Sequence, residues 1–139
     1  VGGVAEYFAE PTSIDEFSYL IKWSNLNKHR CQIIGAGSNL LINNIFIKGL
    51  VVCTKKLKSL KIEPNLGIVE AEAGVMLPTL SNSLAKHGLQ GGEWAVGIPG
   101  TLGGAIYMTA GTDNLSLAKN LISVKVINNK NHKNRPAAA

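Results

Sequence analysis

The chain has 139 residues, 45% hydrophobic and 17% charged, which excludes a disordered protein and suits one globular domain or two small lobes. Its net charge of +5 favours an anionic ligand, but no basic stripe is interleaved with aromatic residues, so we expect no nucleic-acid partner. No apolar run reaches the roughly 18 residues that span a bilayer and no signal peptide opens the chain, so we expect a cytoplasmic protein without a membrane partner.

The first elements in chain order are a strand and a helix. Residues 1–10 begin without Met and contain a short alternating segment that predicts a strand, and we expect the true N-terminus to lie further upstream. Ser13 and Glu16 form a capping box in front of an apolar pattern of helical period, which predicts a helix from Ile14 to Asn27. His29 follows that helix, where a positive charge complements the helix dipole, so we predict a structural role for it.

A buried strand and a glycine-rich loop come next, in the sequence CQIIGAGSNLLI from Cys31 to Ile42. A Rossmann fingerprint would need a third glycine and a following helix, whereas residues 40–42 predict a continuing strand. Successive N–H groups from Ala36 to Asn39 can form an anion nest, and the Ser38 and Asn39 side chains add donors. The residues alone leave a plain hairpin turn equally open.

The middle of the chain predicts two strands and a helix around a lobe boundary. Residues 49–54 predict a buried strand, and the lysine-rich residues 55–67 predict a half-exposed edge strand or linker. We expect a first lobe over residues 1–62 and a second over residues 63–128. In the second lobe, residues 68–73 predict a strand and residues 77–85 a helix, with Pro78 near its start and Gly88 as its stop.

The second glycine-rich stretch, GGEWAVGIPGTLGGAIYMTAG, runs from Gly91 to Gly111. Its small residues and the fixed φ of Pro99 let a large group approach the backbone closely. If a helix begins near Gly100, the unpaired N–H groups of its first turn and its dipole make an anion site for a phosphate-bearing cofactor. A glycine-rich turn packed on a core is the alternative.

The end of the chain predicts one more strand, over residues 123–127. Residues 129–139 are polar and of low complexity, so we expect a disordered or foreign tail. Cys31 and Cys53 are too few for a disulfide framework and have no metal-site spacing, so we expect free core thiols in a reducing compartment and no metal.

Taken together, these motifs resemble the UDP-N-acetylenolpyruvoylglucosamine reductase family of flavoenzymes over nearly the whole chain. The resemblance rests on VGG with Ala5-Glu6, on GAGSNLLI, and on Gly88-Leu89 through EWAVGIPGTLGGAIYM-x-AG, in this order and at similar separations. It implies an α+β fold, with two small α/β lobes of the FAD-binding vanillyl-alcohol-oxidase (PCMH) type that clasp the dinucleotide. It further implies an NADPH-dependent oxidoreductase that converts the UDP-sugar UDP-N-acetylglucosamine enolpyruvate to UDP-N-acetylmuramate in peptidoglycan synthesis.

The resemblance also implies which residues hold FAD. The first lobe wraps the pyrophosphate with Gly35, Ala36, Gly37, Ser38, Asn39 and Leu40. The second lobe approaches it with Gly97, Ile98, Pro99, Gly100, Thr101, Gly103 and Gly104.

The chain departs from the family pattern in three places. Residues 43–46 replace an Asp-x-Gly, and residues 109–114 replace an Asn-Ala-Gly-Ala run near the flavin face. The family's catalytic arginine of a Tyr-Arg-x-Ser motif, its serine proton donor and a late glutamate all follow the matched region, so we assign no catalytic residue and expect this fragment to be inactive. Two other functions stay open, a non-catalytic dinucleotide- or phosphate-binding module and an oxidase of the same flavin superfamily.

Overall fold

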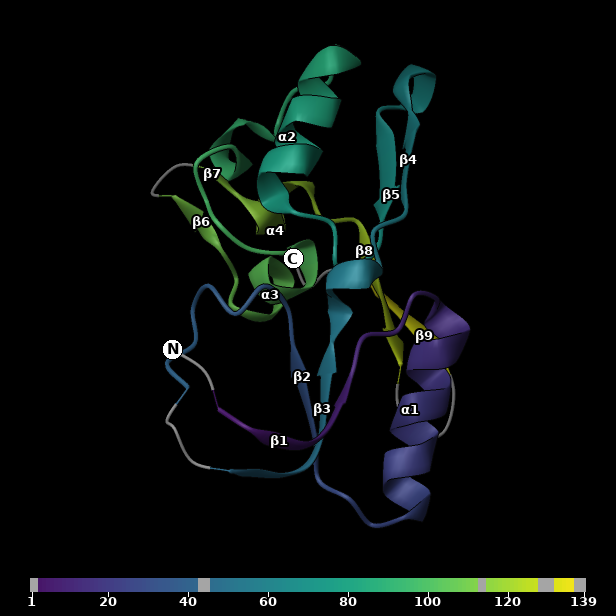
Figure 1. Cartoon of the computed structure of the whole chain (residues 1–139). Coiled ribbons are helices and arrows are strands. Elements are labelled where there is room, and N and C mark those ends of the chain that lie inside the picture. The colour runs from purple at the N-terminus through teal and green to yellow at the C-terminus, as the bar shows by residue number, and fades with distance from the viewer. Residues whose placement is uncertain (1–2, 43–45, 113–114, 128–131, 137–139) are drawn as a thin grey trace.

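The computed structural model describes residues 3–42, 46–112, 115–127 and 132–136. Strands β1–β3 and helix α1 occupy the lower half of Figure 1, and helices α2–α4 with strands β4–β7 occupy the upper half. This arrangement confirms the predicted α+β class. Among the described residues, no helix is both long and apolar enough to cross a membrane.

The lower group is a parallel three-stranded sheet with one helix packed on it. Its strands are β1 (Ala5–Ala9), β2 (Cys31–Ile34) and β3 (Ile47–Cys53), in the order β1-β3-β2. The central strand β3 carries the buried run from Leu50 to Cys53. Because all three strands are parallel, β2 and β3 end at the same edge of the sheet, where ligands of α/β proteins commonly bind.

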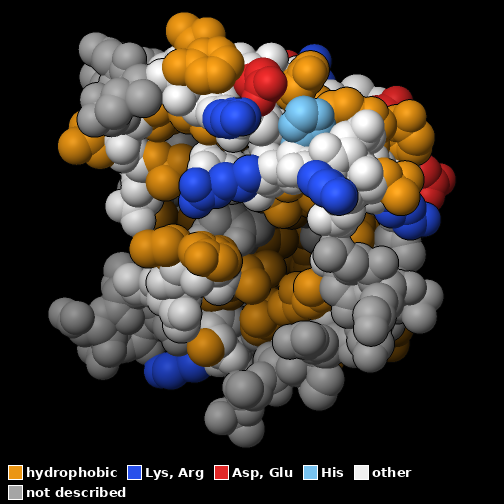
Figure 2. Space-filling view, turned by 90° about the horizontal axis from the view of Figure 1, so that it is seen from below, with side chains coloured by type: hydrophobic (Ala, Val, Ile, Leu, Met, Phe, Trp, Pro, Cys, Tyr) orange, Lys and Arg blue, Asp and Glu red, His pale blue; other side chains and the backbone are white. Residues whose placement is uncertain are grey.

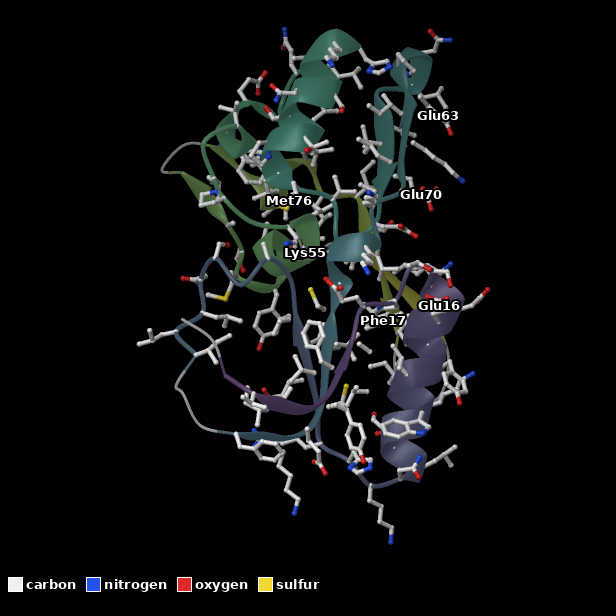
Figure 3. The ribbon with its side chains drawn as sticks, in the orientation of Figure 1. Glu16, Phe17, Lys55, Glu63, Glu70 and Met76 are labelled. Carbon is white, nitrogen blue, oxygen red and sulfur yellow. The ribbon has the colours of Figure 1, made fainter. Side chains whose placement is uncertain are left out.

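Helix α1 (Ile14–Leu26) connects β1 to β2 and begins as the capping box predicts. The Ser13 hydroxyl accepts the Glu16 N–H at 3.2 Å, and the Glu16 carboxylate accepts the Thr12 N–H at 2.7 Å and the Thr12 hydroxyl at 2.9 Å. These bonds from Thr12 lower the pKa of Glu16, which lies in the first turn beside Phe17 (Figure 3). Local sequence alone therefore defines the start of this helix.

An aromatic cluster joins α1 to the sheet. The rings of Trp23 and His29 stack with centroids 5.2 Å apart, and Tyr7 of β1 meets Trp23 edge-on at 5.5 Å. His29 therefore lies beyond the end of the helix, as predicted, and it also packs against Trp23.

The upper group is built around α2 (Leu77–Lys86), η3 (Glu93–Ala95) and α3 (Leu102–Tyr107). Short elements complete it: β6 (Gly111–Thr112), β7 (Leu115–Ser116) and α4 (Leu117–Asn120). The predicted helix with Pro78 near its start and Gly88, which has φ +69°, as its stop is confirmed. The core of this group contains Val75, Leu77, Leu80, Trp94, Ala95, Leu102, Ala105 and Leu117.

A β-hairpin lies across the predicted boundary between the lobes. Strand β4 (Leu60–Glu63) pairs antiparallel with β5 (Ile68–Ala71), with the turns η1 (Thr54–Lys56) and η2 (Pro64–Leu66) before and after β4. Leu60 packs against the core of the upper group. A boundary between residues 62 and 63 divides this hairpin, so a division before Leu60 agrees better with the pairing.

The expectation of a disordered tail over residues 129–139 is wrong where the structure describes it. Residues His132–Pro136 form β9, which pairs antiparallel with the predicted strand β8 (Ser123–Ile127). Pairing gives the facing backbone N–H and C=O groups of the two strands their hydrogen-bond partners. A segment of any side-chain composition has such backbone groups, so a polar sequence does not exclude a strand. The rest of that segment, 129–131 and 137–139, lies outside the described residues.

Several large apolar side chains of the lower group are exposed. Leu41, for example, is 92% exposed. The strand predicted over residues 40–42 is wrong, because the structure has no strand there and the Leu40 N–H closes a turn onto the Gly37 carbonyl at 3.1 Å. Phe8 of β1 and Ile33 of β2 are also more than half exposed. Seen from below, hydrophobic side chains line a hollow, with Lys and Arg side chains along one border (Figure 2).

Candidate functional site

The first loop, residues 35–40, leaves the carboxyl end of β2 and is anchored to the end of β3. The Thr54 hydroxyl donates to the Ile34 carbonyl at 3.2 Å, and the Cys53 thiol donates to the Gly35 carbonyl with Sγ at 3.6 Å. These two bonds hold the start of the loop against the sheet. The residues that anchor the start of the loop thus lie 18 and 20 positions later in the chain than the carbonyls they bond.

The second segment, residues 97–104, lies directly against the first loop. The Ser38 hydroxyl donates to the Pro99 carbonyl at 2.9 Å, across 61 positions of sequence. A Cβ on Gly35 would lie 2.2 Å from Oγ1 of Thr101, and a Cβ on Gly100 would lie 3.1 Å from the Ser38 Oγ. The structure therefore brings together the two glycine-rich stretches that the sequence predicted separately.

The first loop keeps its backbone donors available. Among the described residues, the N–H groups of Ala36, Gly37, Ser38 and Asn39 have no hydrogen-bond acceptor, while that of Leu40 bonds within the loop. Gly37 has φ +75°, and nothing lies within 4 Å of the place that a Cβ would take. Consecutive free N–H groups around a residue in the left-handed region are the features of an anion nest.

The predicted anion site at the start of α3 is wrong for three of its N–H groups. The Leu102 and Gly103 N–H groups donate to the Val75 and Ala73 carbonyls, both at 2.8 Å, and the Gly104 N–H donates to the Thr101 hydroxyl at 3.4 Å. Thr101, which is 2% exposed, also forms a β-bridge with Met76, the residue that precedes α2 (Figure 3). The helix begins where predicted, but the chain itself bonds the donors of its first turn.

The glycines of the two stretches have different neighbours. A Cβ on Gly103 would lie 2.8 Å from the Ala73 Cβ and 3.1 Å from its carbonyl oxygen, so Gly103 is small because α3 packs on Ala73. Gly35 and Gly100 lie where the two stretches touch each other, so a side chain at either position would crowd the other stretch. Gly37 and Gly97 have nothing within 4 Å, so these two positions leave room for a ligand.

The remaining predicted site residues differ in exposure. Ile98 is partly buried and packs against the upper core, whereas Pro99 and Leu40 are exposed. Sequence reasoning missed Thr101 as an N-cap, although a threonine before a helix is a recognisable cap signal. It also missed Ala73, which has no local signal because its contact with Gly103 is purely tertiary.

Both cysteines are free thiols, as predicted. Partial burial raises the pKa of the Cys31 thiol, against a smaller opposite effect of a hydrogen bond with Ser24. Among the residues that the structure describes, no group of three His, Cys, Asp or Glu side chains is placed to hold a metal ion.

Thr109 marks the predicted departure from the family pattern and has an unusual backbone conformation. It follows α3 with φ +52°, and the Ala110 N–H bonds to the Ala105 carbonyl at 2.8 Å in a Schellman-type end. Glycine or asparagine is favoured at such a position, and a β-branched residue is strained there.

Replacing Thr109 with asparagine is expected to raise the free energy of unfolding by about 1 kcal/mol, because asparagine tolerates the left-handed region. Urea denaturation of the parent and of Thr109→Asn measures this change. Thr109→Ser is the control, since it removes the β-branch without the asparagine preference and should gain less. Equal stability of all three proteins would show that Thr109 is not strained.

These features define a fold of two lobes in which two glycine-rich stretches meet at the edge of a parallel sheet. The chain belongs to the FAD binding domain family, which it matches over residues 5–132.

Within that family the chain is similar to part of UDP-N-acetylenolpyruvoylglucosamine reductases, so the predicted resemblance is confirmed. It is 68% identical to the reductase of Prochlorococcus marinus subsp. pastoris over 130 residues, which cover 94% of this chain and 44% of the relative. It is 47% identical to a Synechococcus reductase over 127 residues, which cover 91% of this chain and 42% of the relative. The chain thus spans less than half the length of these curated relatives.

Two solved structures are similar to this chain, one of them a reductase of the same name. The crystal structure of UDP-N-acetylenolpyruvylglucosamine reductase (MurB) from Thermus caldophilus matches with a TM-score of 0.73 and 25% identity, over 94% of this chain and 44% of that chain. Phl p 4, a grass pollen allergen with glucose dehydrogenase activity, matches with a TM-score of 0.70 and 14% identity, over 95% of this chain and 29% of that chain. The second likeness concerns the fold alone.

Proposed function

We propose that this chain is the FAD-binding part of a UDP-N-acetylenolpyruvoylglucosamine reductase. In the whole protein, NADPH would be the hydride donor and UDP-N-acetylglucosamine enolpyruvate the acceptor, giving UDP-N-acetylmuramate for peptidoglycan synthesis. The observation that carries the proposal is the direct contact between the first loop and the second segment, in a chain of the FAD binding domain family. The 68% identity to a reductase of this name supports the substrate assignment.

The pyrophosphate of FAD is the group that fits the first loop. The free N–H groups of residues 36–39 supply donors without any charged side chain, and Asn39 adds a side-chain amide. The open positions at Gly37 and Gly97 allow a bulky dinucleotide to approach the backbone of both stretches. FAD, when bound, supplies the hydride chemistry, and the protein contributes binding and orientation.

We assign cofactor binding alone to these residues. NADPH oxidation, UDP-sugar binding and protonation of the product are proposed for the whole protein, and no residue of this chain is proposed as a catalytic residue. The free cysteines agree with a reducing compartment, so we propose the cytoplasm as its location.

FAD titration of the purified chain tests the proposal. We expect saturable binding at micromolar FAD, followed by flavin fluorescence, and release of intact FAD by acid because the binding is non-covalent. FMN, which lacks the second phosphate and the adenosine, is the matched control and should bind more weakly. A chain that binds inorganic pyrophosphate but not FAD would favour a phosphate-binding module. A folded chain that binds no FAD at about 1 mM would contradict the proposal.

A further inference from the structure

Ser38 contacts the second segment through its side chain, while its backbone stays free for a ligand. Its hydroxyl donates to the Pro99 carbonyl at 2.9 Å, and its Oγ lies 3.1 Å from the place of a Cβ on Gly100. Ser38 is exposed, so this bond lies at the surface where the two stretches meet.

Other hydrogen bonds hold the backbone in place on both sides of this bond. On the side of the first loop, the Cys53 thiol and the Thr54 hydroxyl hold residues 34 and 35. On the other side, the Gly100 carbonyl accepts the Leu77 N–H at 3.0 Å, next to the Pro99 carbonyl that Ser38 reaches. The Ser38 hydroxyl therefore connects two segments that are each held by their own lobe.

We propose that Ser38 is a positioning residue that fixes the spacing of the two stretches before FAD binds. This inference rests on the proposed function. Without the bond, the first loop and the second segment would have to be ordered by the ligand, and that ordering would reduce the affinity. The close approach of Gly35 to Thr101 limits how near the two stretches can lie, and the Ser38 bond fixes their relative orientation.

The alternative role for the same hydroxyl is a direct hydrogen bond to a phosphate of FAD. The two roles differ in the ligand-free protein, because a hydroxyl that acts only on the ligand leaves the free loops unchanged. Hydrogen exchange without FAD therefore separates them, when it is followed at amides that form hydrogen bonds within the chain: Leu40 in the first loop, and Leu102 and Gly103 in the second segment.

The experiment compares Ser38→Ala, Ser38→Thr and the control Ser59→Ala. Ser59 is exposed, and within the described part of the chain its hydroxyl makes no hydrogen bond. We expect Ser38→Ala to speed exchange of these bonded amides in the free protein and to raise the Kd for FAD by about 3- to 10-fold, the effect of one hydrogen bond. Ser38→Thr, which keeps the hydroxyl, should restore both values, and Ser59→Ala should match the parent.

Three outcomes would overturn the proposal. Weaker FAD binding with unchanged exchange would place the hydroxyl on the ligand instead. Faster exchange with unchanged affinity would show that the spacing does not matter for FAD, and no change in either would show that the bond is incidental. If the parent bound no FAD, the proposed function would fail, whereas the exchange data would still show whether Ser38 holds the two stretches together.

Discussion

Replacing Gly37 with valine is expected to abolish FAD binding in a chain that still folds. Gly37 has φ +75° and open space at its Cβ position, in the middle of the free N–H groups of the first loop. A valine side chain would fill the space that the pyrophosphate needs and would be strained in the left-handed region. We expect FAD binding to weaken by at least about 100-fold, or about 2.7 kcal/mol.

Gly67→Val is the matched control for this substitution. Gly67 has φ +64° and nothing within 4 Å of its Cβ position, but it lies in the β4–β5 hairpin, away from the first loop. Both variants should therefore lose similar stability, about 1–2 kcal/mol in urea denaturation, because the backbone strain is alike. Only Gly37→Val should lose FAD in the titration. Equal FAD affinity of the two variants and the parent would show that the first loop is an ordinary turn.

Replacing Gly35 with alanine is expected to destabilise the chain and weaken FAD binding together. The new Cβ would lie 2.2 Å from Oγ1 of Thr101, a side chain that is 2% exposed and has little space to move. Overpacking of this kind typically costs about 1–3 kcal/mol. It would also push the first loop away from the second segment, which FAD is proposed to contact.

A double-mutant cycle with Thr101→Ala tests the cause of this effect. Thr101→Ala removes the clashing hydroxyl and leaves its Cβ 3.4 Å from the new Gly35→Ala methyl, an ordinary contact. By itself it loses the cap of α3, about 1 kcal/mol. In that background Gly35→Ala should cost little, so we expect an interaction energy of at least about 1 kcal/mol in urea denaturation. Additive effects would show that Gly35 is needed for a reason other than Thr101.

Features of the fold that depend on a few neighbouring residues were predicted correctly. Helix α1 begins at its capping box, and α2 has Pro78 in its first turn and ends before Gly88, because caps, proline and glycine act within a few residues of themselves. The wrong predictions share another cause. Among the described residues, no strand pairs with residues 40–42, whereas β9 pairs with β8. Whether such a partner exists cannot be read from the segment itself.

The sequence by itself determined the class of this protein, through two glycine-rich stretches in a chain that matches the FAD binding domain family over residues 5–132. Only the tertiary structure decided what each glycine is for. Gly103 lies against Ala73 and Gly35 against Thr101, whereas Gly37 and Gly97 have open space at their Cβ positions. The sequence does not show this difference, because the neighbouring residues come from other parts of the chain. The same holds for the N–H groups of Leu102 and Gly103, whose acceptors are carbonyls 27 and 30 residues earlier, so a glycine-rich pattern does not show which donors remain for a ligand.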